Sequence, residues 1–147
     1  MALLSSADQD RLRAAFDEMT SPVRLLFFTQ TVGCETCPQT RQILDELPLV
    51  SSKVSIEEVN LVLDAEKAKQ YGIDRAPAVA LVAPDGGDQL RDSRIRFLGT
   101  PSGYEFMSLI HAVLLVGGRP SSLTEQNRAR IAAVDRPVTM QVFTTPT

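Results

Sequence analysis

The sequence is poor in the residues that build metal centres and nucleic-acid surfaces. It has two cysteines, one histidine and no tryptophan in 147 residues. Tetrahedral zinc takes four ligands, so Cys34, Cys37 and the distant His111 could complete a zinc site only if two chains shared it. The formal net charge is −3, and without a basic excess we expect no nucleic-acid partner. We also expect no metal and no bound cofactor.

Long apolar runs are missing as well. No segment approaches the roughly 20 apolar residues of a membrane span, and residues 1–6 have neither the basic nor the apolar region of a secretory signal. The hydrophobic content of 44% is ordinary for a globular domain with one core. We therefore expect a cytoplasmic protein without membrane contact. In a reducing cytosol a close cysteine pair is more often catalytic than structural.

The two cysteines stand together in the segment Gly33-Cys34-Glu35-Thr36-Cys37-Pro38. At this spacing the two sulfurs come close enough to form and break a disulfide. An apolar, strand-like run lies upstream at 23–29, and a helical pattern with Ile43, Leu44 and Leu47 follows. The order of strand, C-x-x-C and helix indicates a redox-active pair.

The expected position of Cys34 at the start of a helix assigns the two cysteines different roles. Free backbone N–H groups and the helix dipole favour a thiolate there, and the thiolate is the nucleophile in disulfide exchange. We therefore predict that Cys34 attacks and that the more buried Cys37 resolves the mixed disulfide. The carboxylate of Glu35 opposes this effect because it disfavours a second negative charge. A structural disulfide and a metal site shared between chains are the alternatives.

The rest of the chain alternates between helical and strand patterns. Helices are expected at 6–19, after Cys37, at 64–70 and at 102–116, and strands at 23–29, 54–61, 78–82 and 94–98. A turn is expected at 84–87, and capping boxes are expected at Ser6 with Gln9 and at Ser102 with Glu105.

This order resembles the thioredoxin fold over residues 6–118. The resemblance implies an α/β fold with a central four-stranded mixed sheet flanked by helices, here with an extra N-terminal helix. The second signature is Arg75-Ala76-Pro77, just before the third strand. In thioredoxin-like proteins the matching proline is cis and sits against the C-x-x-C. The resemblance therefore implies that Ala76 and Pro77 bind substrate, together with the spacer residues Glu35 and Thr36. An ordinary trans proline at a strand start is the alternative.

The end of the chain repeats its beginning. Arg13-Ala14, Pro22-Val23 and Phe28-Thr29 recur in the same register as Arg128-Ala129, Pro137-Val138 and Phe143-Thr144. This repetition predicts a thioredoxin-like domain at 1–118 and the start of a second, incomplete repeat at 119–147. We expect a helix at 121–134 and an extended segment at 138–144. That segment should pack on the first domain or form a homodimer with a neighbouring chain.

The doubling narrows the resemblance to two families. The chain resembles the N-terminal fold of the protein disulfide oxidoreductases, glutaredoxin-like proteins with two tandem thioredoxin folds. It is also similar to the N-terminal domain of the alkyl hydroperoxide reductase flavoprotein subunit, whose first fold has lost its cysteines. The residues that carry the likeness lie at 28–37, 71–77 and 96–106. The Trp-Cys-Gly-Pro-Cys of thioredoxin is absent, and Gly99–Gly103 departs from the segment with which glutaredoxins bind glutathione.

These observations predict a protein-disulfide oxidoreductase that exchanges dithiol and disulfide with protein substrates and serves cell redox homeostasis. One alternative is an electron-relay domain between a flavin disulfide reductase and a peroxidase. The other is an inert scaffold repeat of a tandem thioredoxin protein. The expected partners are protein thiols and disulfides, with a thioredoxin-reductase-like flavoprotein or a peroxidase as dedicated partner. A relay would turn over poorly with generic substrates, and a scaffold would show no reactive thiol.

Overall fold

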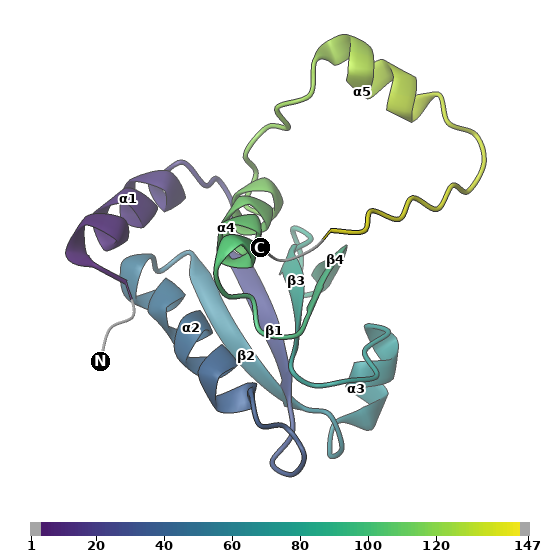
Figure 1. The fold of residues 1–147 in the computed structure, drawn as a ribbon. Helices are drawn as coiled ribbons and strands as arrows, with labels where there is room; N and C mark the ends of the chain where they lie inside the picture. The colour runs from purple at the N-terminus through teal and green to yellow at the C-terminus, as the bar shows by residue number, and fades with distance from the viewer. Residues whose placement is uncertain (1–3, 145–147) are drawn as a thin grey trace.

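The computed structural model describes residues 4–144, which form one sheet, helices on both of its faces and a projecting C-terminal segment (Figure 1). The helices are α1 (Ser6–Asp17), α2 (Cys37–Val50), α3 (Ala65–Gln70), α4 (Tyr104–Val116) and α5 (Glu125–Ala132). The strands are β1 (Val23–Thr29), β2 (Val54–Asn60), β3 (Ala78–Pro84) and β4 (Leu90–Leu98). Among the described residues, no helix has both the length and the apolar character to cross a membrane.

The sheet is mixed, with the strand order β2-β1-β3-β4. Strand β1 runs parallel to β2, with Val23 opposite Val54, and antiparallel to β3, with Phe27 opposite Val79. Strands β3 and β4 pair in antiparallel fashion. This is the four-stranded mixed sheet that the sequence predicts, and it confirms the thioredoxin fold.

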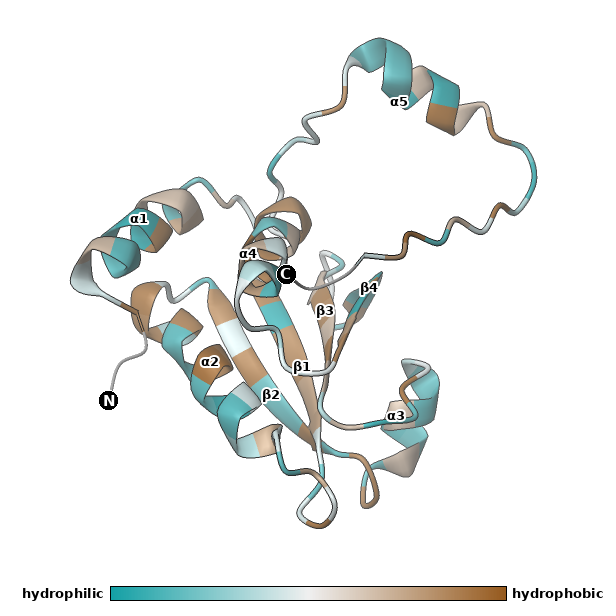
Figure 2. Cartoon of the chain, in the orientation of Figure 1, coloured by the Kyte–Doolittle hydropathy of each residue, from teal (hydrophilic) through white to brown (hydrophobic). Residues whose placement is uncertain are grey.

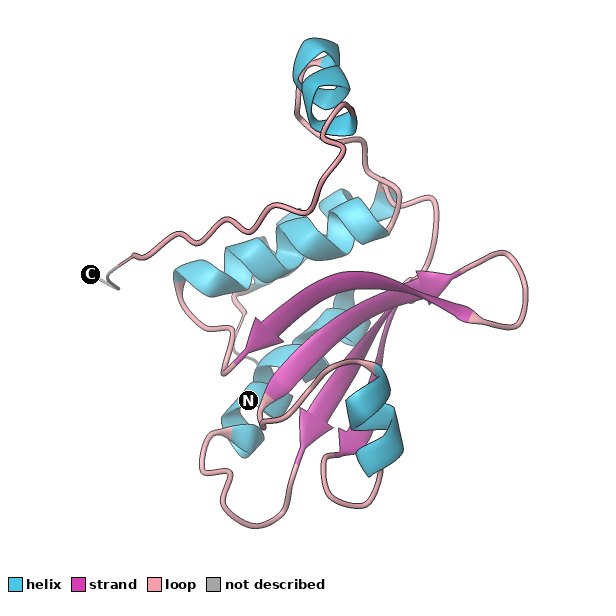
Figure 3. Cartoon of the chain, turned by 90° about the vertical axis from the view of Figure 1, so that its right-hand side faces the viewer, coloured by secondary structure: helices cyan, strands magenta, loops and turns pink. Residues whose placement is uncertain are grey.

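Two cores lie on opposite faces of the sheet because β1 and β3 are apolar on both sides. Successive side chains of a strand point to opposite faces, so Leu25 and Phe27 face one core and Leu26 and Phe28 the other. Helices α1, α2 and α4 cover the first face, and α3 covers the second (Figure 3). Burial on both faces explains why β1 and β3 read as nearly continuous apolar runs.

Strand β4 is longer and less regular than its sequence pattern predicts. It begins at Leu90 and not at 94, and Arg94 takes a positive φ of 64° at an irregularity in the pairing with β3. The Ser93 hydroxyl donates a hydrogen bond to the Leu81 carbonyl oxygen (2.6 Å) there. Strand β3 likewise extends to Pro84, which the sequence pattern places in a turn. The irregularity interrupts the alternation of apolar and polar side chains, so the sequence pattern predicts only the second half of β4.

The predicted capping boxes are both wrong. Helix α1 is capped by Ser5, whose hydroxyl accepts the Asp8 N–H (3.2 Å) and donates to the Asp8 carboxylate (2.6 Å). Ser6 is therefore already inside the helix. Helix α4 has Gly103 as its N-cap residue, with a φ of 58° and no side-chain cap. Only a glycine adopts this conformation without strain, so it displaces Ser102 from the cap position.

The C-terminal segment 119–144 projects from the domain, and each of its described residues is exposed (Figure 1). The predicted helix at 121–134 is present as the shorter α5, and residues 138–144 form no strand. Apolar residues nevertheless recur along the segment, as the brown stretches in Figure 2 show. Residues 138–144 are each exposed and therefore do not pack on the first domain, and the other expected outcome, pairing with a neighbouring chain, stays a prediction.

Candidate functional site

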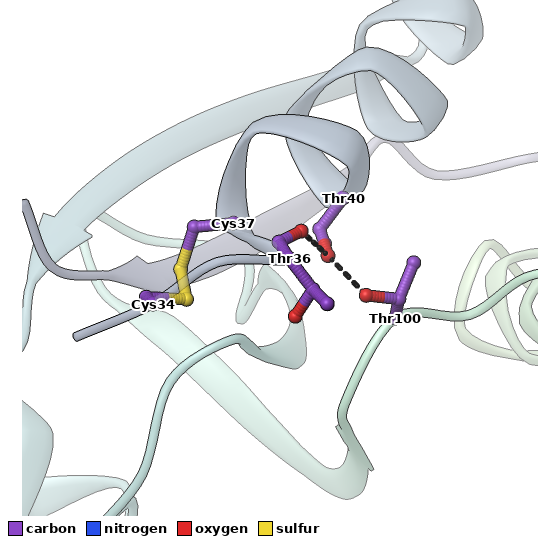
Figure 4. Close-up of a disulfide and its surroundings, with 5 residues drawn as sticks. All are labelled: Cys34, Thr36, Cys37, Thr40 and Thr100. Atoms are coloured by element: carbon purple, nitrogen blue, oxygen red, sulfur yellow. Dashed lines mark hydrogen bonds between the residues drawn. A yellow bond between two sulfur atoms is a disulfide. The ribbon is translucent and has the colours of Figure 1, made fainter.

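The C-x-x-C segment lies between the end of β1 and the first turn of α2. Cys34 and Cys37 form a disulfide, with their Cα atoms 5.4 Å apart (Figure 4). Helix α2 begins at Cys37, and Thr36 is its N-cap residue. Pro38 suits this position because the first N–H groups of a helix have no intrahelical partner in any case. Cys34 therefore lies just before the helix, as the sequence predicts.

The two cysteines differ in burial. Cys37 is 5% exposed and belongs to the core cluster that α1, α2 and α4 form on the sheet. Cys34 is only partly buried and packs against the edge of that cluster. The spacer residues Glu35 and Thr36 are exposed. A substrate sulfur approaching from solvent would therefore reach Cys34 more easily than Cys37.

A short chain of hydrogen bonds fixes the start of α2. The buried Thr40 hydroxyl donates to the Thr36 carbonyl oxygen (2.9 Å), which also accepts the Thr40 N–H (2.9 Å). The same hydroxyl is 2.8 Å from the Thr100 hydroxyl (Figure 4). This pair was not predicted from the sequence. A threonine four residues after an N-cap can bond back to the cap carbonyl, but nothing in the sequence indicates a partner sixty positions away.

The Ala76–Pro77 peptide bond is cis, the isomer that the resemblance implies, and it immediately precedes β3. Ala76 packs against the same core cluster as Cys34, whereas Pro77 is buried. The Pro77 carbonyl oxygen accepts a hydrogen bond from the Gly99 N–H (2.9 Å). The residues just before α4 thus contact the proline segment as well as α2.

Arg96 of β4 anchors the chain that leads from α3 to Pro77. Its Nε donates to the Tyr71 carbonyl oxygen (3.0 Å), and its guanidinium lies over the Tyr71 ring, 5.6 Å from the ring centre. The guanidinium also donates two hydrogen bonds to the Asp92 carboxylate, and these bonds hold the pKa of that carboxyl below its ordinary value. This contact ties the segment before Pro77 to the sheet edge.

No cluster of candidate metal ligands accompanies the two cysteines in the described part of the chain. Within residues 4–144, no group of three or more histidine, cysteine, aspartate or glutamate side chains is placed to hold a metal ion. His111 is exposed on α4.

Comparison with known proteins yields relatives but no matching protein-family model. The alkyl hydroperoxide reductase component AhpF of Xanthomonas campestris pv. phaseoli is 31% identical over 122 residues. The match covers 81% of this chain and 19% of that protein. The chain thus spans about a fifth of the length of this relative.

Solved structures show the same relationship. The NTD_N/C domain of the alkyl hydroperoxide reductase AhpF from Enterococcus faecalis superposes with a TM-score of 0.79 at 27% identity, over 90% of this chain and 62% of that chain. A protein disulfide oxidoreductase from Aeropyrum pernix shares the fold, with a TM-score of 0.72 at 21% identity, over 88% of this chain and 54% of that chain. This chain is therefore thioredoxin-like, and its C-x-x-C disulfide supports thiol–disulfide oxidoreductase chemistry in general.

Proposed function

We propose that this protein is a protein-disulfide oxidoreductase in which Cys34 is the nucleophile and Cys37 the resolving residue. The observation that carries the proposal is the disulfide between a partly exposed Cys34 and a buried Cys37 at the first turn of α2. Such an arrangement presents one sulfur to a substrate and keeps the other within reach but sheltered.

Exchange proceeds in two steps that conserve electrons. In the reduced protein the Cys34 thiolate attacks one sulfur of a substrate disulfide, so a mixed disulfide forms and one substrate thiolate leaves. Cys37, deprotonated in turn, attacks the Cys34 sulfur, which re-forms the Cys34–Cys37 disulfide and releases the second substrate thiolate. The two protons of the protein dithiol end on the two substrate thiols. The reverse sequence oxidises a substrate dithiol.

The start of α2 supplies the electrostatic assistance. The N–H groups of its first turn point toward the residues before the helix, where Cys34 lies, and together with the helix dipole they favour the thiolate. The exposed Glu35 beside Cys34 opposes them with its negative charge. The start of α2 therefore favours the thiolate form of Cys34, and the charge of Glu35 disfavours it.

Substrate contacts are proposed for Glu35, Thr36, Ala76 and Pro77. Glu35 and Thr36 are exposed beside the two sulfurs, and Ala76 packs against the same cluster as Cys34. A substrate strand lying beside Cys34 would contact both segments. Replacing Ala76 by lysine should raise KM for a disulfide-bonded protein more than it lowers kcat, because the added side chain obstructs binding and leaves the sulfurs intact.

Reduction of insulin by dithiothreitol tests the proposed activity. The full chain should accelerate the appearance of the reduced chains, and Cys34→Ser should abolish the acceleration. A Cys34→Ser/Cys37→Ser double variant serves as the control for non-specific effects of added protein. A wild-type chain that adds nothing to the rate with dithiothreitol alone would refute general protein-disulfide exchange.

An electron-relay role is the second candidate, favoured by the similarity to the alkyl hydroperoxide reductase component AhpF. A relay uses the same two sulfurs but exchanges electrons with a dedicated flavoprotein and a peroxidase. Fast reduction of the Cys34–Cys37 disulfide by NADH and a flavoprotein disulfide reductase, with slow insulin turnover, would favour the relay. Fast insulin turnover without preference for that reductase would favour the general oxidoreductase.

The domain organisation proposed from the sequence assigns 1–118 to the redox domain and 119–147 to the start of a second repeat. Its support is the repeated pattern and the exposed apolar residues of the segment, among them Met140, Val142 and Phe143. Such residues suit a contact with a second copy, so a homodimer through this segment is proposed. Solution sizing of the intact chain against a form ending at Gly118 tests it, since only the intact chain should dimerise.

A further inference from the structure

Residues 99–100 connect the two segments of the site. The Gly99 N–H donates to the Pro77 carbonyl oxygen (2.9 Å), and the adjacent Thr100 hydroxyl reaches the Thr40 hydroxyl (2.8 Å). Thr40 in turn bonds the Thr36 carbonyl oxygen, inside the C-x-x-C spacer (Figure 4). Hydrogen bonds on either side of the covalent Gly99–Thr100 link thus connect the spacer between the cysteines with the proline segment.

The number of hydroxyl hydrogens determines which threonine is the donor in the Thr40–Thr100 hydrogen bond. A hydroxyl has one hydrogen to donate, and Thr40 uses its hydrogen on the Thr36 carbonyl oxygen. The Thr100 hydroxyl is therefore the donor to Thr40. Each donation increases the polarity of the next bond, so Thr100 strengthens the bond that Thr40 makes to the spacer.

The Thr36 carbonyl oxygen, which accepts the bond from Thr40, belongs to the peptide group that joins the N-cap residue to the first residue of α2. The Thr36 carbonyl and the Cys37 N–H belong to one planar peptide unit and point in opposite directions. Because the carbonyl points along α2 toward Thr40, the Cys37 N–H points back toward the residues before the helix. Hydrogen bonds on the carbonyl oxygen make that N–H a stronger donor and fix its direction.

We propose that Thr40 and Thr100 are positioning residues that orient and polarise the Thr36–Cys37 peptide group and thereby stabilise the Cys34 thiolate. This inference rests on the proposed function and deepens it, since it assigns part of the reactivity of Cys34 to side chains outside the C-x-x-C segment. Thr40 and Thr100 act through the peptide group and touch no substrate.

Alkylation of the reduced, full-length chain measures this effect. Iodoacetamide labelling of Cys34, quantified by peptide mass spectrometry across a pH series, gives the reactivity of its thiolate. Thr40→Val removes the hydroxyl and keeps the shape, Thr40→Ser keeps the hydroxyl, and Thr100→Val removes only the outer donor. Thermal unfolding of each variant checks that it folds.

The expected order of reactivity follows the hydrogen-bond series. Thr40→Val should slow the labelling of Cys34 near neutral pH by roughly three- to tenfold and move its pH midpoint upward. Thr100→Val should slow it by about twofold, and Thr40→Ser should stay within about twofold of wild type. The Thr40→Val/Thr100→Val double variant should match Thr40→Val, because Thr100 acts only through Thr40.

Two results would overturn the inference. One is a folded Thr40→Val protein with wild-type labelling, and the other is an equal loss in Thr40→Val and Thr40→Ser. If Thr40→Val does not fold, Thr100→Val decides, since Thr100 is only partly buried. Failure of the proposed function looks different: the wild-type chain itself would then show no reactive Cys34 and no insulin reduction.

Discussion

Residues 6–29 and 121–144 carry the same pattern of amino acids but differ in structure. In the first segment Phe16 and Leu25 are fully buried, whereas their counterparts Ile131 and Met140 are 60% and 87% exposed. Both segments form a capped helix, α1 after Ser5 and α5 after Thr124. Only the first has α2, α4 and two neighbouring strands to pack against. Local sequence thus suffices for the helix, and burial requires partner surfaces.

The need for partner surfaces is clearer still when residues 23–29 are compared with residues 138–144. β1 is a strand because β2 and β3 flank it and satisfy its backbone groups. Residues 138–144 have a similar apolar pattern but form no strand in the described part of the chain. An isolated strand gains too little to offset its lost conformational entropy.

The largest predicted difference between the two segments concerns their apolar side chains. Leu25→Ala should lower the free energy of unfolding by about 2–5 kcal/mol, because it opens a cavity in the core. Met140→Ala, at the matching exposed position, should change the value by less than about 0.5 kcal/mol when it is measured for the monomer, at a protein concentration too low for the proposed homodimer to form. Urea unfolding of both variants measures this contrast. A comparable loss in monomeric Met140→Ala would show that the C-terminal segment packs on its own chain.

A smaller difference is expected for the two helix caps. Ser5→Ala should cost about 1 kcal/mol of unfolding free energy, because α1 is anchored in the core through Leu12 and Phe16. Thr124→Ala removes the equivalent hydrogen bond from α5, which contacts no core. It should lower the helical circular-dichroism signal and leave the unfolding free energy unchanged. A lower free energy of unfolding in Thr124→Ala would contradict the account, because it would show that α5 is packed in the way that α1 is.

The smallest difference concerns two ion pairs and depends on pH. Asp92 has a lowered pKa in the folded protein because Arg96 hydrogen-bonds its carboxylate. Its contribution is therefore present above the ordinary carboxyl pKa of about 4 and lost as pH falls through the lowered folded value. Asp92→Asn should cost roughly 0.5 kcal/mol at neutral pH, discounted for partial exposure, and less in acid.

The matched control for that pH experiment is Asp135→Asn in the C-terminal segment, where Asp135 and Arg136 are both 82% exposed. This change should leave stability the same at every pH. Urea unfolding at neutral and acidic pH measures both variants. If the loss of unfolding free energy in Asp92→Asn were as large in acid as at neutral pH, the loss would not come from the ion pair with Arg96.

Much of the domain could be predicted from the sequence because its strands and helices have regular apolar patterns. The run 23–29, the C-x-x-C and Pro77 are local signals that need no distant information. The caps at Ser5 and Gly103 were missed because neighbouring serines offered equally plausible boxes, and backbone conformation decided between them.

The features that the sequence could not provide are contacts between distant residues. Arg96 meets Tyr71, and Thr40 meets Thr100, only because β3 and β4 bring their segments beside α3 and α2. The irregularity at Arg94 is likewise set by pairing with β3. Such contacts refine the site, whereas the cysteine pair at its centre is visible in the sequence alone.

Trapping of the mixed disulfide tests the central claim most directly. The reduced Cys37→Ser chain, mixed with a disulfide-bonded peptide, should accumulate a covalent adduct on Cys34, because no second thiol is left to release it. The reduced Cys34→Ser chain should form little adduct, since its remaining thiol at Cys37 is buried. Rapid adduct formation on Cys37, with none on Cys34, would contradict the assignment.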